Sequence, residues 1–345
     1  MKYILEITTK IGCSNMCEYC PQTKLVRKYM KNVHMHTLND YFNKAGDNIH
    51  KAFMDEYLKK DKNRETMMSL ETFKKCLSTI DPSVDIHFSG YVEAFENPQA
   101  IDMVEYAVEK GHSVGINTTL MFLSNEIIDR LANIGKRFKH FSVHTPSATY
   151  FETIGIIGKT SFLRDDPRDK AKKDKKISEK YLDLLGYMID NASKVNAVFH
   201  THSAPGYGLH PEVEERYGDQ MRNIGYKNRG LNSRAGNIGK LTGEALWKNN
   251  WCQRIIHNVL LPDGGVQLCC QDYGLEEPIG NLLHMPYHTL FETKRFKEIM
   301  QGKASICQRC DDGVAVPNSE KMRLRRMEFA EDSWRIEKMK EKSKL

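Results

Sequence analysis

Three cysteines stand within eight positions near the N-terminus: Cys13, Cys17 and Cys20 in "IGCSNMCEYCPQ". One disulfide would leave a thiol over, and a tetrahedral zinc site would need a fourth ligand, which does not stand close by. Three thiolates from one loop can hold three irons of a [4Fe–4S] cluster, and the fourth iron then stays open to bind a substrate or cofactor. The spacing therefore favours a catalytic iron–sulfur cluster. The alternatives are a zinc knuckle whose fourth ligand comes from a distant part of the chain, and free thiols buried in the core.

A second set of cysteines lies in the last third of the chain. The order is C-x11-G-x4-C from Cys252 to Cys269, then C-x2-C at Cys307 and Cys310. Two such pairs can supply four thiolates to one metal centre, although the spacing alone suits a structural zinc ribbon equally well. Cys269 and Cys270 compete for one ligand position. The glycine spacing favours Cys269, and since adjacent strand residues point to opposite faces, Cys270 is expected to face away.

Composition narrows the class of protein. The 345 residues carry a net charge of +6, and nine cysteines occur without a secretory signal. These features indicate a reducing compartment, the cytoplasm, where thiols serve as ligands rather than as disulfides. No apolar run is long enough for a membrane span. The charged run at 164–180 is interpreted as a solvated loop, with a basic grip on an anionic substrate as the alternative.

The elements that must position the cysteines alternate regularly up to residue 240. Strands are expected at 3–9, 84–90, 112–119, 140–146 and 194–203, and helices at 69–80, 98–111, 124–135, 178–193 and 211–225. Strands that are each followed by a helix pair in parallel through right-handed crossovers. About six such units predict an α/β protein with a partial (βα)6 TIM-like barrel, whose reactive groups lie at the carboxyl ends of the strands.

Beyond residue 240 the pattern changes. The stretch 257–270 predicts a β-hairpin around an Asp-Gly-Gly turn, and a helix is expected at 288–302. The predicted domains are the barrel at 1–238, a small hairpin-plus-helix domain at 239–315, and a basic C-terminal helix or tail at 316–345. Cys76 falls inside a helical pattern and is expected to be a core residue.

The first cysteine motif, C-x3-C-x-aromatic-C, resembles the signature of the radical S-adenosylmethionine superfamily. The resemblance implies that the open iron chelates the amino and carboxylate groups of S-adenosylmethionine. One electron then cleaves the sulfonium, and the resulting 5′-deoxyadenosyl radical removes a hydrogen atom from the substrate. Tyr19 matches the aromatic position beside the adenine.

The same resemblance implies further cofactor contacts at three strand ends. Tyr91 and Val92 stand where the family's Gly-Gly-Glu-like motif has small residues, so that motif is degenerate here. For the residues at the last two strand ends, Asn117, Thr118, Ser142 and His144, the alternative is that their polar side chains only cap the strand ends. The residues that match cofactor-binding positions are Ser89, Gly90, Glu93, Asn117, Thr118, Ser142 and His144.

The C-terminal cysteines resemble the SPASM/twitch extension that follows such barrels. The full SPASM pattern has further cysteines after the position of Cys310, and none is present here. The shorter twitch form, with one auxiliary [4Fe–4S] cluster, therefore fits better. The stretches "LCCQDYG" and "SRAGNI" are also similar to sequences of this group.

The resemblance implies an oxidoreductase-type enzyme in which the auxiliary cluster accepts an electron from the substrate radical. We expect a small hydroxylated substrate, such as a sugar or aminocyclitol, because the first strand starts at Lys2 and leaves no room for a peptide-binding module. Arg234 is the candidate to orient that substrate, with a structural arginine as the alternative. A flavodoxin- or ferredoxin-type protein would supply electrons.

Three other functions stay open at this point. The chain could be a peptide-modifying enzyme, a transfer-RNA-modifying enzyme, or a non-enzymatic zinc protein that binds nucleic acid through its basic segments. A nucleic-acid partner is not expected, because the sequence lacks interleaved basic and aromatic residues.

Overall fold

The computed structural model describes residues 3–15, 17, 19–30, 65–149, 154, 176–203, 206–229, 234–235, 237, 253–299, 304–307 and 310. Within this part the strands form a nine-stranded sheet in the order β6-β5-β4-β3-β2-β1-β7-β8-β9. Cys252, residues 164–175 of the basic run and the predicted C-terminal helix lie outside the described residues.

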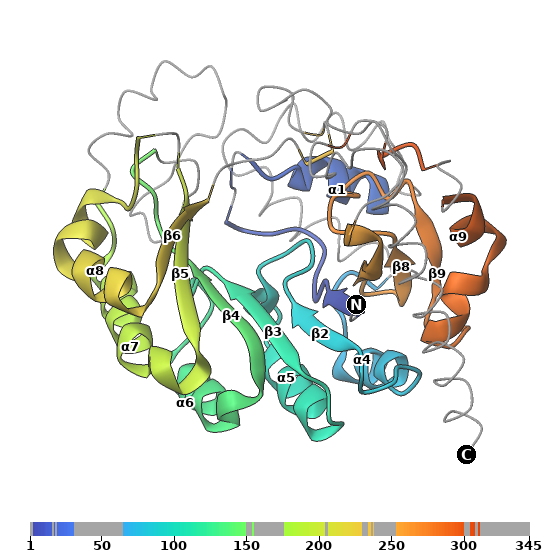
Figure 1. Ribbon diagram of the computed structural model, residues 1–345, viewed down its shortest axis with the longest axis horizontal. Coiled ribbons are helices and arrows are strands. Elements are labelled where there is room, and N and C mark those ends of the chain that lie inside the picture. Colours follow the sequence, from blue (N-terminus) through green and yellow to red (C-terminus); the bar gives the residue numbers. More distant parts are fainter. Residues whose placement is uncertain are drawn as a thin grey trace, which may run out of the picture.

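Neighbouring strands from β1 to β6 are parallel and form the open barrel that the alternation predicted. The strands are β1 (Ile4–Ile7), β2 (Asp85–Phe88), β3 (Val114–Thr118), β4 (Phe138–His144), β5 (Ala197–His202) and β6 (Tyr226–Arg229). The helices α4 (Leu70–Leu77), α5 (Ala100–Glu109), α6 (Asn125–Ile134), α7 (Glu179–Val195) and α8 (Pro211–Ile224) lie along the outer face of the sheet (Figure 1). The predicted fold class is confirmed.

Serine caps explain where three of these helices begin. The hydroxyls of Ser69, Ser124 and Ser178 each accept a hydrogen bond from the backbone N–H three residues later. Such caps satisfy a donor that the first helical turn leaves without a partner. Short 3-10 turns occur at Ala94–Glu96, Gly135–Arg137 and Gln253–Ile256.

The C-terminal hairpin extends the barrel sheet. Strand β7 (His257–Leu260) pairs in parallel with β1, and β8 (Gly265–Gln267) returns antiparallel to β7, as the hairpin prediction requires. Gly264 makes the turn at φ +80°, a conformation that favours glycine. Strand β9 (Pro278–Asn281), which was not predicted, pairs with β8.

The helix predicted at 288–302 is broken, so that prediction was wrong in extent. A 3-10 turn, η6 (Tyr287–Glu292), precedes a short helix, α9 (Lys294–Glu298). Thr293 has extended backbone between them, and its hydroxyl accepts from the Phe296 N–H. A side chain that caps a new helix start competes with continuation of the preceding turn.

Helix α1 (Gln22–Tyr29) directly follows the first cysteine loop and was also not predicted. Its residues Leu25, Val26 and Tyr29 are fully buried in a small apolar group with Val259 and Tyr273 of the C-terminal segment. Because it contacts that segment, α1 joins the cysteine loop to the hairpin domain.

The main core lies between the sheet and its outer helices. Leu5 and Ile7 on β1 point into this core, whereas Glu6 between them lines the cavity on the inner side. Cys76 is fully buried in α4, which confirms the prediction of a core residue. No helix among the described residues is long and apolar enough to cross a membrane.

Candidate active site

One cavity of about 400 Å³ brings together the first three cysteines, and all of Cys13, Cys17 and Cys20 line it. The loop that carries them is tied to the barrel. The Ser14 N–H and hydroxyl donate to the Glu96 carboxylate at 3.0 and 2.6 Å, and the Asn15 amide donates to the Thr119 hydroxyl at 2.9 Å. The predicted grouping of the three thiols is therefore present at the carboxyl ends of the strands.

Cys20 has two polar neighbours. Its sulfur lies 3.6 Å from the Gln22 amide nitrogen and 3.6 Å from the Tyr273 hydroxyl. Both groups can donate a hydrogen bond to a thiolate, and such bonds tune iron–sulfur centres.

Glu93 joins the loop after β2 to the end of β3. Its carboxylate accepts hydrogen bonds from the Thr118 hydroxyl at 2.9 Å, the Thr119 N–H at 2.6 Å and the Thr119 hydroxyl at 2.8 Å. Burial nevertheless raises the pKa of Glu93. Ser89 and Gly90 line the same cavity. A Cβ at Gly90 would lie 2.4 Å from the Thr8 hydroxyl oxygen, so glycine lets the loop cross the end of β1.

Tyr19 lies against a cluster of imidazoles. Its hydroxyl is 3.2 Å from both ring nitrogens of His144, and its ring centroid is 5.1 Å from that of His202. His144 stacks on His200 with centroids 5.0 Å apart. Burial lowers the pKa of His144, and of His200 to about 2, with the positive charge of Arg229 adding to both effects. The lowered pKa values favour the neutral forms of His144 and His200, which can both donate and accept hydrogen bonds.

The structure separates two predicted cofactor residues. Asn117 lines the cavity and pairs through its side-chain oxygen with the His140 ring nitrogen at 2.8 Å. Ser142 is fully buried and does not line the cavity, because its hydroxyl lies 2.8 Å from His200 Nδ1, behind that ring.

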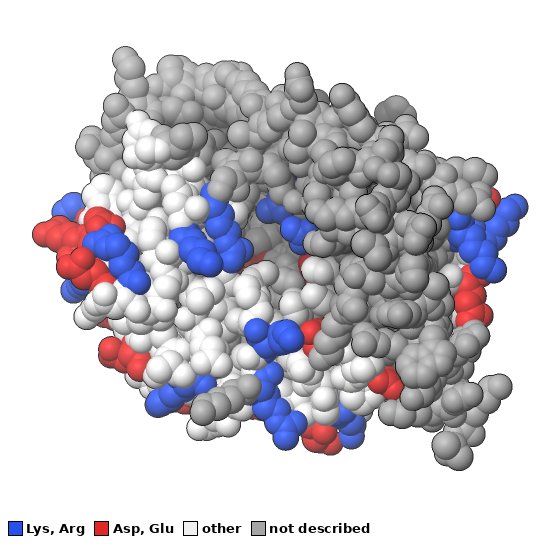
Figure 2. Space-filling model, in the orientation of Figure 1, with Lys and Arg blue, Asp and Glu red and all other residues white. Residues whose placement is uncertain are grey.

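Three arginines line the cavity: Arg229, Arg234 and Arg254. Figure 2 shows basic side chains around a hollow on this face of the molecule. Burial acts to lower the pKa of Arg234, but the phenol and thiol groups around it, Tyr273 and Cys20 first, outweigh this and raise the pKa. Arg234 is therefore in the cavity, as its predicted role requires.

Cys269 and Cys270 point to opposite sides, as expected. Cys269 belongs to the main core, where Cys307 packs, and burial raises the pKa of its thiol. Cys270 instead lines the cavity of the first cysteine set. The Tyr91 hydroxyl donates to the Cys269 carbonyl at 2.8 Å, which fixes this segment against the loop after β2. The Cys310 N–H donates to the Cys307 carbonyl at 3.5 Å.

Several cavity residues escaped sequence reasoning. Alternating polar residues on a strand, as in "FHTHS", were the available signal for the histidines, and a lone carboxylate in an apolar strand was the signal for Glu6. The residues missed are Glu6, Asn15, Gln22, Thr119, His200, His202, Arg229, Arg254, Cys270 and Tyr273.

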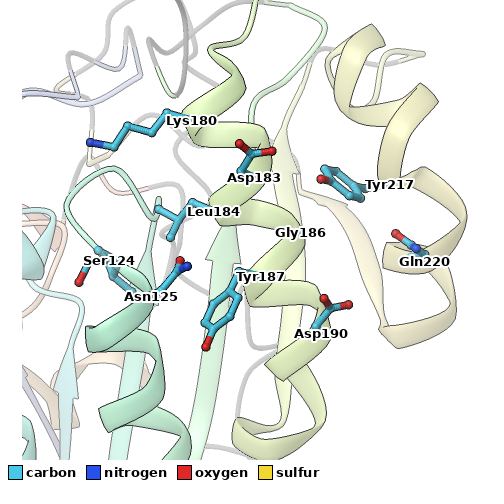
Figure 3. A pocket seen from close by; sticks show the side chains of 11 residues that line it. Ser124, Asn125, Lys180, Asp183, Leu184, Gly186, Tyr187, Asp190, Tyr217 and Gln220 are labelled. Carbon is cyan, nitrogen blue, oxygen red and sulfur yellow. The ribbon is translucent and has the colours of Figure 1, made fainter.

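A second hollow lies between α6, α7 and α8 on the outer side of the barrel (Figure 3). Its lining includes Lys180, Asp183 and Tyr187 but no cysteine or histidine among the described residues. It therefore lacks, in its described lining, the thiols and imidazoles that hold iron–sulfur or zinc centres.

Residues 252–311 match the SPASM family, an iron–sulfur cluster-binding domain. The fold is similar to that of BtrN, solved in complex with AdoMet and 2-DOIA. The identity is 16%, the TM-score is 0.50, and the match covers 93% of this chain and 96% of BtrN. Residues 252–311 thus match an iron–sulfur cluster-binding domain, and the chain has the fold of a protein solved with AdoMet. Both findings bear out the predicted resemblance to radical S-adenosylmethionine proteins of the SPASM/twitch type.

Two further solved structures resemble this chain at lower scores. They are native anSMEcpe with bound AdoMet (14% identity, TM-score 0.42, 92% of this chain and 91% of that chain) and Streptococcus suis SuiB bound to S-adenosylmethionine (11%, 0.43, 91% and 73%). No curated protein matches the chain.

The residues present fit the cofactors that this fold implies. Within the described part no three Cys, His, Asp or Glu side chains converge on one metal ion. A cube does not need such convergence, because each thiolate binds a different iron. The Gln22 side-chain oxygen is buried at the cavity without a hydrogen-bond partner in the described part of the chain, as expected of a group that accepts from a ligand.

Proposed function

We propose that the protein uses a cluster held by Cys13, Cys17 and Cys20 to cleave S-adenosylmethionine and remove a hydrogen atom from a small hydroxylated molecule, such as a sugar or aminocyclitol, in a two-electron oxidation. The observation that carries the proposal is the single cavity that the three thiols share with Tyr19 and Glu93. When bound, the cluster and S-adenosylmethionine supply the carbon radical that removes the hydrogen.

The cavity residues have distinct tasks in this proposal. Tyr19 packs beside the adenine, and Asn117 lies near the ribose. Glu93 keeps its carboxylate rigid toward the methionine amino group through its bonds with Thr118 and Thr119. A rigid, largely buried cavity shields a radical from water.

Oxidation of an alcohol carbon also releases a proton and an electron. Glu6 lines the cavity, and burial raises the pKa of its carboxyl to about 7, a value suited to a general base near neutral pH. We assign the hydroxyl proton to Glu6 and the orientation of the substrate to Arg234. Cys252, Cys269, Cys307 and Cys310 would hold the auxiliary cluster that accepts the electron. A flavodoxin- or ferredoxin-type donor would reduce the first cluster.

The first experiment measures iron per chain and 5′-deoxyadenosine release in anaerobically reconstituted protein, with S-adenosylmethionine and dithionite and a panel of sugars and aminocyclitols. We expect about eight irons, at four per cube. Replacement of Cys13, Cys17 and Cys20 together by alanine should abolish 5′-deoxyadenosine release, whereas Cys76→Ala should retain it. Iron-replete protein that releases no 5′-deoxyadenosine would contradict the proposal.

A further inference from the structure

Cys270 is a cavity thiol to which the oxidation gives no role. Its side chain is 9% exposed and packs with Tyr91 and Tyr273 at the cavity wall. The preceding residue, Cys269, faces the main core instead. The segment after β8 thus puts one thiol toward the proposed auxiliary cluster and the next toward the proposed site of the radical.

Polar groups hold Cys270 in place. Its sulfur lies 3.7 Å from Arg254 Nη1, and it shares the cavity wall with the Glu6 carboxyl, whose pKa it lowers. The partnerless oxygen of Gln22 lies on the same cavity and indicates independently that a ligand occupies this space. Cys270 therefore faces a ligand site rather than a closed core.

We propose that Cys270 donates a hydrogen atom to a substrate carbon radical in this cavity, which gives the enzyme a second, non-oxidative outcome. The proposal rests on the proposed function for the formation of that radical. A thiol S–H bond is weaker than the C–H bond of a carbon that bears a hydroxyl, so the transfer runs downhill. The O–H bonds of the three cavity phenols, Tyr19, Tyr91 and Tyr273, are of similar strength, so the Cys270→Ser variant below is needed to separate the thiol from the phenols.

The transfer conserves atoms and electrons. The S–H bond of Cys270 breaks, a C–H bond forms on the substrate, and a thiyl radical remains on Cys270. The thiyl takes one electron from a low-potential iron–sulfur reductant and one proton from the Glu6 carboxyl, which regains a proton from solvent. The adjacent Cys269, a proposed ligand of the auxiliary cluster, makes the electron path short.

The outcome depends on the auxiliary centre. An oxidised cluster held by Cys269 and its proposed partner cysteines would take the electron, and the substrate would be oxidised. When it is already reduced, Cys270 returns a hydrogen atom instead. Return to the face opposite the removal gives a stereoisomer of the substrate, with two electrons consumed per turnover, one for cofactor cleavage and one for the thiyl.

A test without substrate uses the reconstituted holoenzyme with S-adenosylmethionine and dithionite in D2O. Cys270 then carries deuterium, and we expect deuterium in the methyl group of the released 5′-deoxyadenosine. Cys270→Ser should lose this label, and Cys76→Ala, the matched core cysteine, should keep it. The measured quantity is the ratio of deuterated to total 5′-deoxyadenosine, which does not depend on the rate of S-adenosylmethionine cleavage. Label that persists in Cys270→Ser, or is absent from the wild type, overturns the proposal.

A second readout is independent of turnover. Iodoacetamide treatment of the holoenzyme, followed by peptide mass spectrometry, should alkylate Cys270 and leave Cys269 protected, and S-adenosylmethionine should slow the reaction. Protection of Cys270 equal to that of Cys269 would show that the thiol is not accessible from the cavity and would overturn the proposal. If Cys270 is alkylated but S-adenosylmethionine is not cleaved, the proposed function fails instead.

Discussion

The sulfur of Cys20 lies 3.6 Å from the hydroxyl oxygen of Tyr273, a residue 253 positions later in the chain. The contact joins the N-terminal cysteine loop to the segment that carries Cys269 and Cys270. Burial raises the pKa of the Tyr273 phenol well above its ordinary value, so the phenol keeps its proton and can donate it to a thiolate. The two halves of the site are thereby linked through one hydroxyl group.

Tyr273→Phe removes this donor and should lower the reduction potential of the first cluster. A hydrogen bond to a ligand sulfur stabilises the more negative, reduced state, so its loss makes reduction harder. For a one-electron couple the shift is ~60 mV for each 1.4 kcal/mol of lost preference. A potentiometric titration followed by electron paramagnetic resonance measures it. Tyr287→Phe, at a buried phenol outside the cavity lining, is the control, and equal potentials in wild type and Tyr273→Phe would contradict the contact.

Glu93→Gln should weaken S-adenosylmethionine binding. The carboxylate accepts from three donors of Thr118 and Thr119, whereas an amide would turn an NH2 group toward some of them. An unsatisfied buried donor costs about 1–3 kcal/mol, which displaces the loop after β2. Isothermal titration calorimetry of the cluster-loaded protein measures the affinity. Glu109→Gln, a surface change, should not alter it, and an unchanged affinity in Glu93→Gln would exclude Glu93 from the site.

The elements that could be predicted from the sequence are those with local signals. Helices α4 to α8 and strands β1 to β5 follow hydrophobic periodicity, and the spacing of Cys13, Cys17 and Cys20 defines a loop without any tertiary information. Strand β6, "YKNR", has no such signal, because the three residues after Tyr226 are polar and exposed.

The remaining features depend on tertiary contacts. The hairpin turn predicts the β7–β8 pair, but the parallel pairing of β7 with β1 is decided by packing. The wall of histidines likewise results from the closeness of β4 and β5, which brings His144 against His200 and His202. Arg254 and Cys270 reach the cavity only because the C-terminal segment adds to the edge of the barrel.

The Glu6 carboxyl should make stability depend on pH. Burial raises its pKa from 4.5 to about 7, so the folded state holds a proton that the unfolded state releases between these values. This contribution is complete below pH 4.5 and is lost as pH rises to about 7. The difference in unfolding free energy between wild type and Glu6→Gln should therefore fall by about 3 kcal/mol across that window and stay constant above it.

Urea unfolding of both proteins at intervals from the acid side to the alkaline side of this window measures the difference. The buried histidines have lowered pKa values and act with the opposite sign, since their contribution is lost as pH falls. They are common to both proteins and cancel in the comparison. Parallel pH profiles for wild type and Glu6→Gln would mean that the carboxyl is not buried as described.

Gly90→Ala should disturb the close packing of the loop after β2 against the end of β1. The new methyl would lie 2.4 Å from the Thr8 hydroxyl oxygen and 2.8 Å from backbone atoms of Ile7, and the backbone cannot turn away as a side chain can. Overpacking of this kind costs about 1–3 kcal/mol. The loop also carries Glu93, so S-adenosylmethionine affinity should fall together with thermal stability.

Gly208→Ala is the matched control for this change. A Cβ at Gly208 would meet only the Tyr226 hydroxyl oxygen, at 3.6 Å, which is an ordinary contact. We expect its melting temperature and S-adenosylmethionine affinity to stay near those of the wild type. If Gly90→Ala behaved like Gly208→Ala, the close approach of the loop to β1 would not exist in solution. The positions of Ser89 and Glu93 in the cavity would then lose their structural basis.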